Sequence, residues 1–374
     1  MTVTLGDLAD LIDTIAPFHT ACDWDNVGLL VGDAERKVTK ALFTLDATAE
    51  VAREATRLKA NVIVSHHPPF FDPMKRFDLS KTPGSILAEL IQNDIGLIVA
   101  HTNLDVSPDG TNKALAELLD IESLEPLFSQ PFEESHYKFV VYVPVGYEMK
   151  IIEAINRGGG GVIGKYSHCT FRTVGTGTFL PHEGAKPFLG KKGELEEAKE
   201  CRMETIVPQG LMDTLLKEVV KAHPYEEVAY DIYPLKIKSE IGGLGMKGRL
   251  SRSMTVEKFA EKAKTVLKSQ SVDSIRGKKR AIKKIALCSG AADRVVEACF
   301  PGEVDALLCG ELKYHSMLEA RHRGMSVIAA GHHETEMPGM RRLARLVGNH
   351  PRIKNESSFT LCLSKTDRTP VKRV

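Results

Sequence analysis

Three short apolar runs in the chain each end in histidine, and two of them add a carboxylate four residues after it. The residues concerned are His66 and His67 after the first run, His101 and Asp105 after the second, and His332, His333 and Glu336 after the third. Mixed imidazole and carboxylate ligands suit zinc, manganese or iron, and are too rich in nitrogen for magnesium or calcium. A carboxylate can also bridge two ions about 3.5–4 Å apart, as two-metal hydrolytic sites require. The three run ends therefore predict a shared transition-metal site.

The adjacent histidines His66 and His67 favour two ions over one. Neighbouring side chains on an extended backbone point to opposite sides, so the pair is expected to serve two neighbouring ions unless the backbone bends sharply. Pro68 and Pro69 prevent the strand from continuing or turning directly into a helix. Taken singly, each motif also has a structural interpretation: a histidine pair in a surface loop, or strand-end polar residues that cap the next helix.

The elements that position these residues have the pattern of a parallel α/β sheet. Residues 62–64 are an apolar, β-branched run, typical of a strand buried on both faces. A strand at 40–45, a helix at 48–59 and a strand at 61–65 imply a right-handed parallel crossover, and 95–100 predicts another strand. Ligands of open α/β sheets bind outside the carboxyl ends of the strands, where the histidines fall.

The last third of the chain continues the α/β alternation. Strands are predicted at 284–288, 306–309 and 327–330. Pro338 is expected to begin the helix after the third of these strands, with Glu334 or Thr335 as its cap.

The middle of the chain has a different pattern. From about residue 127 the expected order of elements is βαββαβ, the split pattern of ferredoxin-like domains. We therefore predict a split α/β metal-binding domain, residues 1–126 and 237–374, that carries a ferredoxin-like α+β insert at 127–236.

Composition excludes several classes of function. With 50 basic and 49 acidic side chains the net charge is +1, so no overall field attracts nucleic acid or a membrane surface. Seven cysteines without a Cys-x-x-Cys pair indicate reduced thiols, and no signal peptide or run of membrane length is evident, so we expect a cytoplasmic protein. Gly-x-Gly-x-x-Gly occurs at 159–164 and 243–248, but neither copy follows a strand and opens a helix, so no dinucleotide cofactor is predicted.

Four motifs give the chain a family resemblance over essentially its whole length. They are Trp-Asp-Asn-Val-Gly-Leu at 24–29, Ser-His-His-Pro at 65–68, His-Thr-Asn-Leu-Asp at 101–105 and Gly-His-His-Glu-Thr-Glu at 331–336. The chain resembles the dinuclear-metal-centre proteins known as GTP cyclohydrolase I type 2 homologues. Residues 177–190 and 222–233 resemble the long bacterial form, whose middle domain is similar to the trimeric CutA module.

The resemblance implies a ligand set and an assembly. The implied metal ligands are His66, His67, Asp105, His332 and Glu336, with His101 as a further ligand or a supporting residue and His333 as a non-ligating neighbour. Two divalent transition ions per chain are implied, zinc first, with iron or manganese as alternatives. The implied assembly is a homo-oligomer, a hexamer with three-fold contacts between the inserts.

The chain departs from the family pattern at two places. Ser-Gly-Ala-Ala at 289–292 replaces the usual Gly-Gly-Ser-Gly, and Gly310-Glu311 stands where Gly-Asp is common. Neither departure touches the implied ligands.

Two functions remain open from the sequence. The first is a hydrolase in which two ions activate a water molecule to attack a nucleotide or another phosphate-bearing small molecule. The alternative is a non-catalytic metal-binding or regulatory assembly whose insert senses a ligand. A hydrolase must keep an open coordination position and a residue that supports a base, whereas a storage or sensor protein needs neither.

Overall fold

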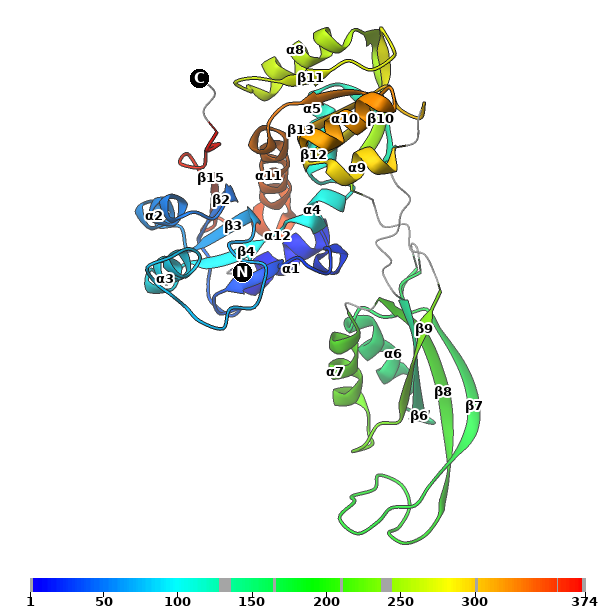
Figure 1. Cartoon of the computed structure of the whole chain (residues 1–374). Coiled ribbons are helices and arrows are strands. Elements are labelled where there is room, and N and C mark those ends of the chain that lie inside the picture. Colours follow the sequence, from blue (N-terminus) through cyan, green and yellow to red (C-terminus); the bar gives the residue numbers. More distant parts are fainter. Residues whose placement is uncertain are drawn as a thin grey trace. The chain divides into compact units, whose positions relative to one another are not determined.

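The computed structural model shows two compact units, Met1–Phe132 with Glu240–Val374, and Glu133–Ser239 (Figure 1). It describes residues 3–127, 136–163, 166–208, 211–236, 244–299, 302–354 and 356–371. Within these ranges no helix has both the length and the apolar content needed to cross a bilayer. The chain is a mixed α/β protein with several sheets.

The first sheet of the split unit carries the first two histidine-bearing strand ends. Its five strands lie in the order β1 (Gly28–Val31), β4 (Gly96–Val99), β3 (Val62–His67), β2 (Lys40–Asp46) and β15 (Thr360–Leu363). The predicted crossover is observed, since β2 and β3 are parallel and α2 (Ala49–Leu58) connects them. Strands β3 and β4 are parallel neighbours, so their carboxyl ends meet at one edge of the sheet.

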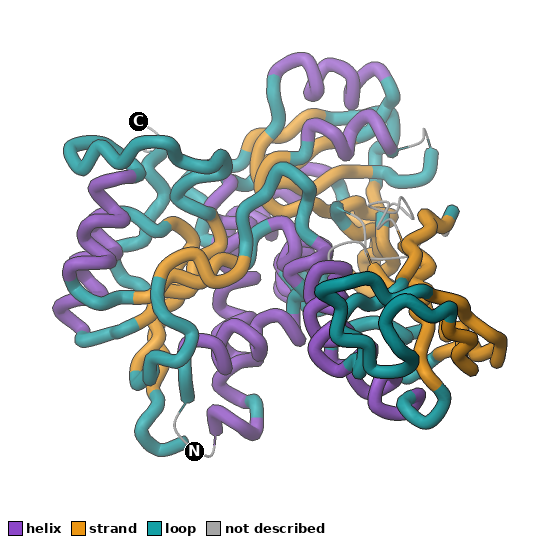
Figure 2. Tube along the Cα trace, turned by 90° about the horizontal axis from the view of Figure 1, so that it is seen from below, coloured by secondary structure: helices purple, strands orange, loops and turns teal. Residues whose placement is uncertain are grey.

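Helices cover both faces of this sheet (Figure 2). On one face Leu42, Ile63 and Leu97 pack against α2 and α3 (Gly84–Gln92). On the other face Phe43, Val64 and Ile98 pack against α1 (Leu5–Ile15) and α11 (His332–Asn349). Burial on both sides explains the continuous apolar run at 62–64, because no residue of the strand faces solvent until its end.

The second sheet of the same unit has six strands. Their order is β11 (Asp273–Ile275), β14 (Ser326–Ala329), β13 (Ala306–Glu311), β12 (Ile282–Ala291), β10 (Met246–Met254) and β5 (Ile121–Pro126). The three predicted strands β12, β13 and β14 are parallel to one another. One face packs against α5 (Thr111–Leu118) and α8 (Val256–Leu267), the other against α9 (Asp293–Ala298) and α10 (Tyr314–His322).

Helix α11 connects the two sheets, because it contacts β2 of the first and β12 and β13 of the second. The prediction that Pro338 begins this helix is wrong: the helix begins at His332, and Pro338 lies inside it. Gly331, with φ of +101°, turns the chain from β14 directly into the helix, so no separate start at the proline is needed. Proline inside a helix leaves the carbonyl four residues before it, that of Glu334, without its helical donor.

The second unit contains six elements in the order βαββαβ. They are β6 (His136–Pro144), α6 (Glu148–Arg157), β7 (Thr170–Phe179), β8 (Glu196–Pro208), α7 (Met212–Ala222) and β9 (Tyr230–Leu235). The antiparallel sheet has the order β7-β8-β6-β9, and α6 and α7 pack on one face of it through residues such as Phe139, Met203 and Leu215. The sequence pattern predicts that the third and the last of these six elements begin at Tyr166 and Glu227 or near them, whereas β7 begins at Thr170 and β9 at Tyr230.

The start of the segment after β15 is held against helix α2 by a buried carboxylate. Glu54 of α2 accepts hydrogen bonds from Ser364 Oγ at 2.5 Å and from the backbone N–H groups of Lys365 and Thr366 at 3.1 and 3.2 Å. Burial acts to raise the pKa of Glu54, but the hydrogen bonds from Ser364 and Thr366 lower it overall. The carboxylate thus stabilises the fold only while it is ionised.

We expect Glu54→Gln to lower the free energy of unfolding by about 1–3 kcal/mol at neutral pH, because the buried donors lose a charged acceptor. A carboxyl whose folded pKa is depressed contributes stability above its unfolded pKa of about 4.3, and that stability is lost as pH falls through the folded value. The variant should therefore lose less stability than the wild type on acidification. Urea titrations at several pH values measure this, with the exposed Glu35→Gln as control; equal pH dependence of wild type and variant would contradict it.

Candidate metal centre

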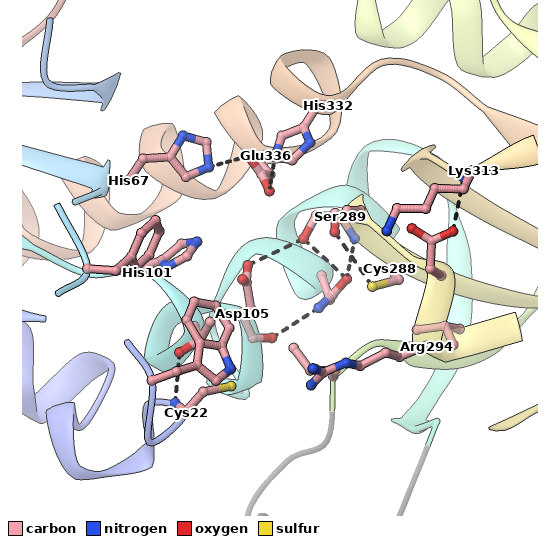
Figure 3. Close-up of a pocket in the computed structure, with 18 residues that line it drawn as sticks. Cys22, His67, His101, Asp105, Cys288, Ser289, Arg294, Lys313, His332 and Glu336 are labelled. Carbon is pink, nitrogen blue, oxygen red and sulfur yellow. Dashed lines mark hydrogen bonds and ion pairs between the residues drawn. The ribbon is translucent and has the colours of Figure 1, made fainter. Parts of the chain in front are cut away.

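The predicted ligands come together at the edge of the first sheet, beside helix α11 (Figure 3). His66 and His67 are the last residues of β3, and His101 lies two residues after the end of β4 as the N-cap of α4 (Thr102–Val106), which contains Asp105. His332 and Glu336 occupy the first turns of α11, one helical turn apart. Residues from three separate stretches of sequence therefore meet in one place.

The donor atoms form two groups that share one residue. Ligand atoms of His66, His67 and His101 lie within 4.8 Å of one another, and so do those of His67, His332 and Glu336. The rings of His66 and His67 converge, with centroids 5.0 Å apart, rather than pointing to opposite sides as an extended backbone would suggest. His67 Nε2 lies 3.2 Å from Glu336 Oε2. Two adjacent three-residue groups with a common member are suited to hold metal ions.

Two buried atoms of the site lack a hydrogen-bond partner. His66 is fully buried, and its Nε2 atom makes no hydrogen bond and lies 3.6 Å from Asp105 Oδ1. Oε2 of the buried Glu336 likewise has no well-aligned hydrogen bond, and its ion-pair partner His67 Nε2 lies 3.2 Å away. Buried polar atoms are normally satisfied, so lone pairs left open at this point fit a bound cation.

Each imidazole of the site is held through its other nitrogen. In every case Nδ1 lies at hydrogen-bond distance from an oxygen atom, which leaves Nε2 directed toward the site, as is usual for metal-binding histidines. The contacts are His66 to the Ala100 carbonyl at 2.8 Å, His67 to Asp46 at 2.8 Å, His101 to Asp25 at 2.9 Å and His332 to Glu311 at 3.1 Å.

The three carboxylates in these contacts were not predicted as site residues. Asp46 ends β2 and is the cross-strand neighbour of His67, a register that a sequence does not state. Asp25 belongs to the Trp-Asp-Asn motif, and its second oxygen accepts from the Thr102 hydroxyl. Glu311 ends β13 and follows Gly310. For Asp46 and Glu311 the position at a strand end was the available signal, whereas Asp25 lies in the loop before β1 and only its motif pointed to it.

The charges of the site are strongly coupled. Burial lowers the pKa of His66 to about 3. For His67 burial acts to lower the pKa, but the neighbouring carboxylates of Asp46 and Glu336 raise it to about 10, and Glu336 likewise raises the pKa of His332 to about 9. Burial opposes ionisation of Glu336, yet the close contacts with His332 and His67 depress its pKa. The ionised Glu336 carboxylate can therefore stay buried only beside positive charge, which protonated histidines or a metal cation can supply.

Asp105 is connected to the second sheet by a chain of hydroxyl groups. Thr111 Oγ1 donates to Asp105 Oδ1 at 2.6 Å, and Ser289 Oγ donates to Thr111 Oγ1 at 2.8 Å. The Asn112 side chain donates to the Asp105 carbonyl and accepts from the Ser289 backbone N–H. Burial, followed by the charge of Glu336, raises the pKa of Asp105 to about 7.

His333 lies apart from the other histidines. Its Nε2 atom is 3.4 Å from Asp367 Oδ1, in the segment after β15, and it belongs to neither group of candidate ligands. Asp367 in turn accepts hydrogen bonds from the Thr44 hydroxyl and the Leu45 N–H. His333 therefore links α11 to the C-terminal segment, and Asp367 joins that segment to β2.

A cavity of about 590 Å³ opens beside the candidate ligands, within the size range of small-molecule sites. His67, His101, Asp105, His332 and Glu336 line one part of it. Its other lining residues include Cys22, Trp24, Phe71, Ser289, Arg294 and Lys313. The centre is thus accessible to a small molecule.

Comparison with known proteins places the chain in a family. A profile described as Duf34/NIF3 (NGG1p interacting factor 3) matches residues 3–370. A Halalkalibacterium halodurans protein called GTP cyclohydrolase 1 type 2 homolog is 36% identical over 322 residues, 86% of each chain, and the Bacillus subtilis protein of that name is 33% identical over 368 residues, 97% of this chain and 96% of its own. The crystal structure of a Bacillus cereus protein related to NIF3 superimposes with a TM-score of 0.75 at 35% identity over the full length of both chains. The predicted resemblance is confirmed, and the chain belongs to the Duf34/NIF3 family.

Proposed function

We propose that this protein is a metal-dependent hydrolase that uses two divalent transition ions, zinc in the first place, to act on a nucleotide or another phosphate-bearing small molecule. His66, His67, Asp105, His332 and Glu336 would hold the ions, with His101 as a further ligand or a residue that supports one. Iron and manganese suit the same mixed nitrogen and oxygen donors. Such ions, when bound, lower the pKa of a coordinated water toward neutrality.

The observation that carries the proposal is the shared position of His67 between two groups of ligand atoms on the wall of an open cavity. Two adjacent groups fit two neighbouring ions, and the cavity leaves room for water and substrate on the same side. The oxygen atoms that hold each Nδ1 fix the rings, so that binding a cation requires little rearrangement. The name of the relatives, GTP cyclohydrolase 1 type 2 homolog, supports a nucleotide as substrate.

We expect protein purified without chelator to carry about two transition ions per chain at saturation. Asp105→Ala and Glu336→Ala should each lower the metal content sharply and reduce hydrolysis by about a hundredfold or more. Elemental analysis and a hydrolysis screen across nucleotides and phosphoesters measure the two effects. His333→Ala is the matched control, since this histidine contacts Asp367 instead of the site.

A metal content of one ion per chain or none, measured at saturating metal concentration, would refute the dinuclear centre. Normal metal content without hydrolysis of any compound in the screen would instead favour the non-catalytic, metal-binding assembly.

Gly290 offers a test of the site that removes no ligand. A methyl group at this position would overlap the Glu336 carboxylate and lie 3.2 Å from His332 Nε2, and its φ of +65° also disfavours a side chain. We therefore expect Gly290→Ala to weaken metal binding about tenfold or more while the fold is retained. Gly175→Ala is the control, because a methyl group there meets nothing within 4 Å. Unchanged metal affinity in Gly290→Ala would contradict the role of Glu336.

We further propose that the second unit is a ferredoxin-like, CutA-like module and that it assembles the protein. Its sheet has two edge strands, β7 and β9, and an exposed edge must be covered or paired. Tyr230, Ile232 and Tyr233 on β9 are 42%, 37% and 49% exposed, and Phe171 on β7 is 68% exposed. Apolar surface of this kind favours contact with another subunit. The proposed assembly is a homohexamer with three-fold contacts between these units, in the cytoplasm.

We expect light scattering at micromolar concentration to show a multiple of three chains. Replacing residues 133–239 by a short Gly/Ser linker should reduce the assembly, to a dimer, without loss of metal, because the described candidate ligands all lie in the split unit. A monomeric full-length protein, or an oligomer of unchanged size after the replacement, would refute the proposed assembly. A folded replacement protein that binds no metal would show that the second unit supplies ligands.

A further inference from the structure

Two exposed aromatic rings form one wall of the cavity beside the metal centre. Trp24 is 52% exposed and Phe71 is 46% exposed, and their ring centroids lie 5.6 Å apart. Both rings also contact the candidate ligand His101, at centroid distances of 6.0 and 5.9 Å. The Asn26 side chain donates to the Phe70 carbonyl and so ties the two loops together. Large rings left open to a cavity offer a planar ligand a stacking surface.

Two unpaired cations form another part of the cavity wall. Arg294 and Lys313 line the cavity and are exposed, and in the part of the chain that the structure describes neither charged group has a hydrogen-bond or ion-pair partner. The adjacent Asp293 carboxylate accepts from the Lys313 backbone N–H and the Ser316 hydroxyl, at 2.9 and 2.5 Å. An arginine and a lysine that line the same side of a cavity without a carboxylate partner suit a phosphate group.

The cationic and metal-binding sides of the cavity face each other. Arg294 and Lys313 lie across it from His67 and His101 (Figure 3). Trp24, Arg294 and Lys313 nevertheless line one and the same cavity. A ligand whose ring lies on the aromatic wall can therefore place an anionic group at Arg294 while its ring stays beside the metal ligands.

We propose that the cavity recognises a nucleoside monophosphate or a close analogue, with the planar ring stacked on Trp24 and packed against the tilted ring of Phe71, and the phosphate held by Arg294 and Lys313. This inference rests on the proposed function, whose substrate class and orientation it specifies. The ring, and not the phosphate, is then the part of the ligand that lies next to the metal centre. A cavity of about 590 Å³ accommodates a ligand of this size.

The chain provides its own reporter, because Trp24 is its single tryptophan. We expect AMP to quench the tryptophan fluorescence of the metal-loaded protein in a saturable manner. Adenosine should quench to a similar extent but only at about tenfold or higher concentration, because it lacks the phosphate. Ribose 5-phosphate, which lacks the ring, should leave the fluorescence nearly unchanged. Equal affinity for AMP and adenosine, or no quenching by either, would overturn the proposal.

Variants separate the two halves of the site. Arg294→Gln and Lys313→Gln should each raise the dissociation constant of AMP about tenfold and leave that of adenosine unchanged. Phe71→Leu should weaken both ligands about tenfold, because it removes part of the stacking surface. Arg341→Gln, an exposed arginine of α11 that does not line this cavity, is the matched control. Unchanged AMP affinity in Arg294→Gln and Lys313→Gln together would place the phosphate elsewhere and refute the assignment.

Binding and turnover are measured separately. The nucleotide is recovered after each titration and analysed by chromatography. Charge-dependent quenching with AMP recovered intact, in a protein that also hydrolyses nothing in the screen, would support this binding site and refute the hydrolase. If nucleotides are hydrolysed but AMP binds equally well without the charges of Arg294 and Lys313, the hydrolase is supported and this binding site is refuted.

Discussion

A carboxylate buried among imidazoles is the interaction on which the architecture of this protein depends. Glu336 is 4% exposed, and an isolated ionised carboxylate in such a position would cost several kcal/mol. It is compensated by His67 and His332, whose Nε2 atoms lie 3.2 and 3.1 Å from its two oxygens. The first histidine comes from the five-stranded sheet and the second from the same helix as Glu336. The charge can be buried only when helix α11 is seated against the end of β3.

Through its position, α11 makes the metal centre depend on both parts of the split unit. The helix begins directly after β14 of the second sheet, yet its apolar residues Met340, Leu343 and Val347 complete the core under the first sheet. The start of α11 lies so close to β12 and β13 that two residues of these strands have no room for a side chain. A methyl group on Gly290 would overlap Glu336, and one on Gly310 would meet the Thr335 hydroxyl. The candidate ligands of the centre lie both before and after the second unit in the sequence. That unit occupies a connection between the two parts, and none of the described candidate ligands comes from it.

The sequence predicted the parts of this structure that follow from local pattern. The apolar run at 62–64 and the histidines after it predicted a buried strand with polar groups at its end, and both are observed. Strands β5 and β10 were not predicted, because charged residues such as Glu122 and Arg249 interrupt them and neither has the continuous apolar run that marks the buried parallel strands. The supporting carboxylates were missed for another reason. Asp46 contacts His67 only because of the register in which β2 pairs with β3, and this register cannot be read from the sequence.

The departures from the family pattern can now be interpreted physically. Ser289, the first residue of the Ser-Gly-Ala-Ala segment, donates its hydroxyl to Thr111, which in turn donates to Asp105. Glu311, in place of the common aspartate, reaches His332 Nδ1 at 3.1 Å, so a carboxylate is kept at this contact with one more methylene group. Both changes affect the groups that orient candidate ligands, while the candidate ligands keep the family's residue types. Hydrogen bonds to a ligand tune its basicity as well as its direction. The chain therefore differs from the family pattern in how the ligands are supported, and this is where differences in metal preference between members of the family would be expected to arise.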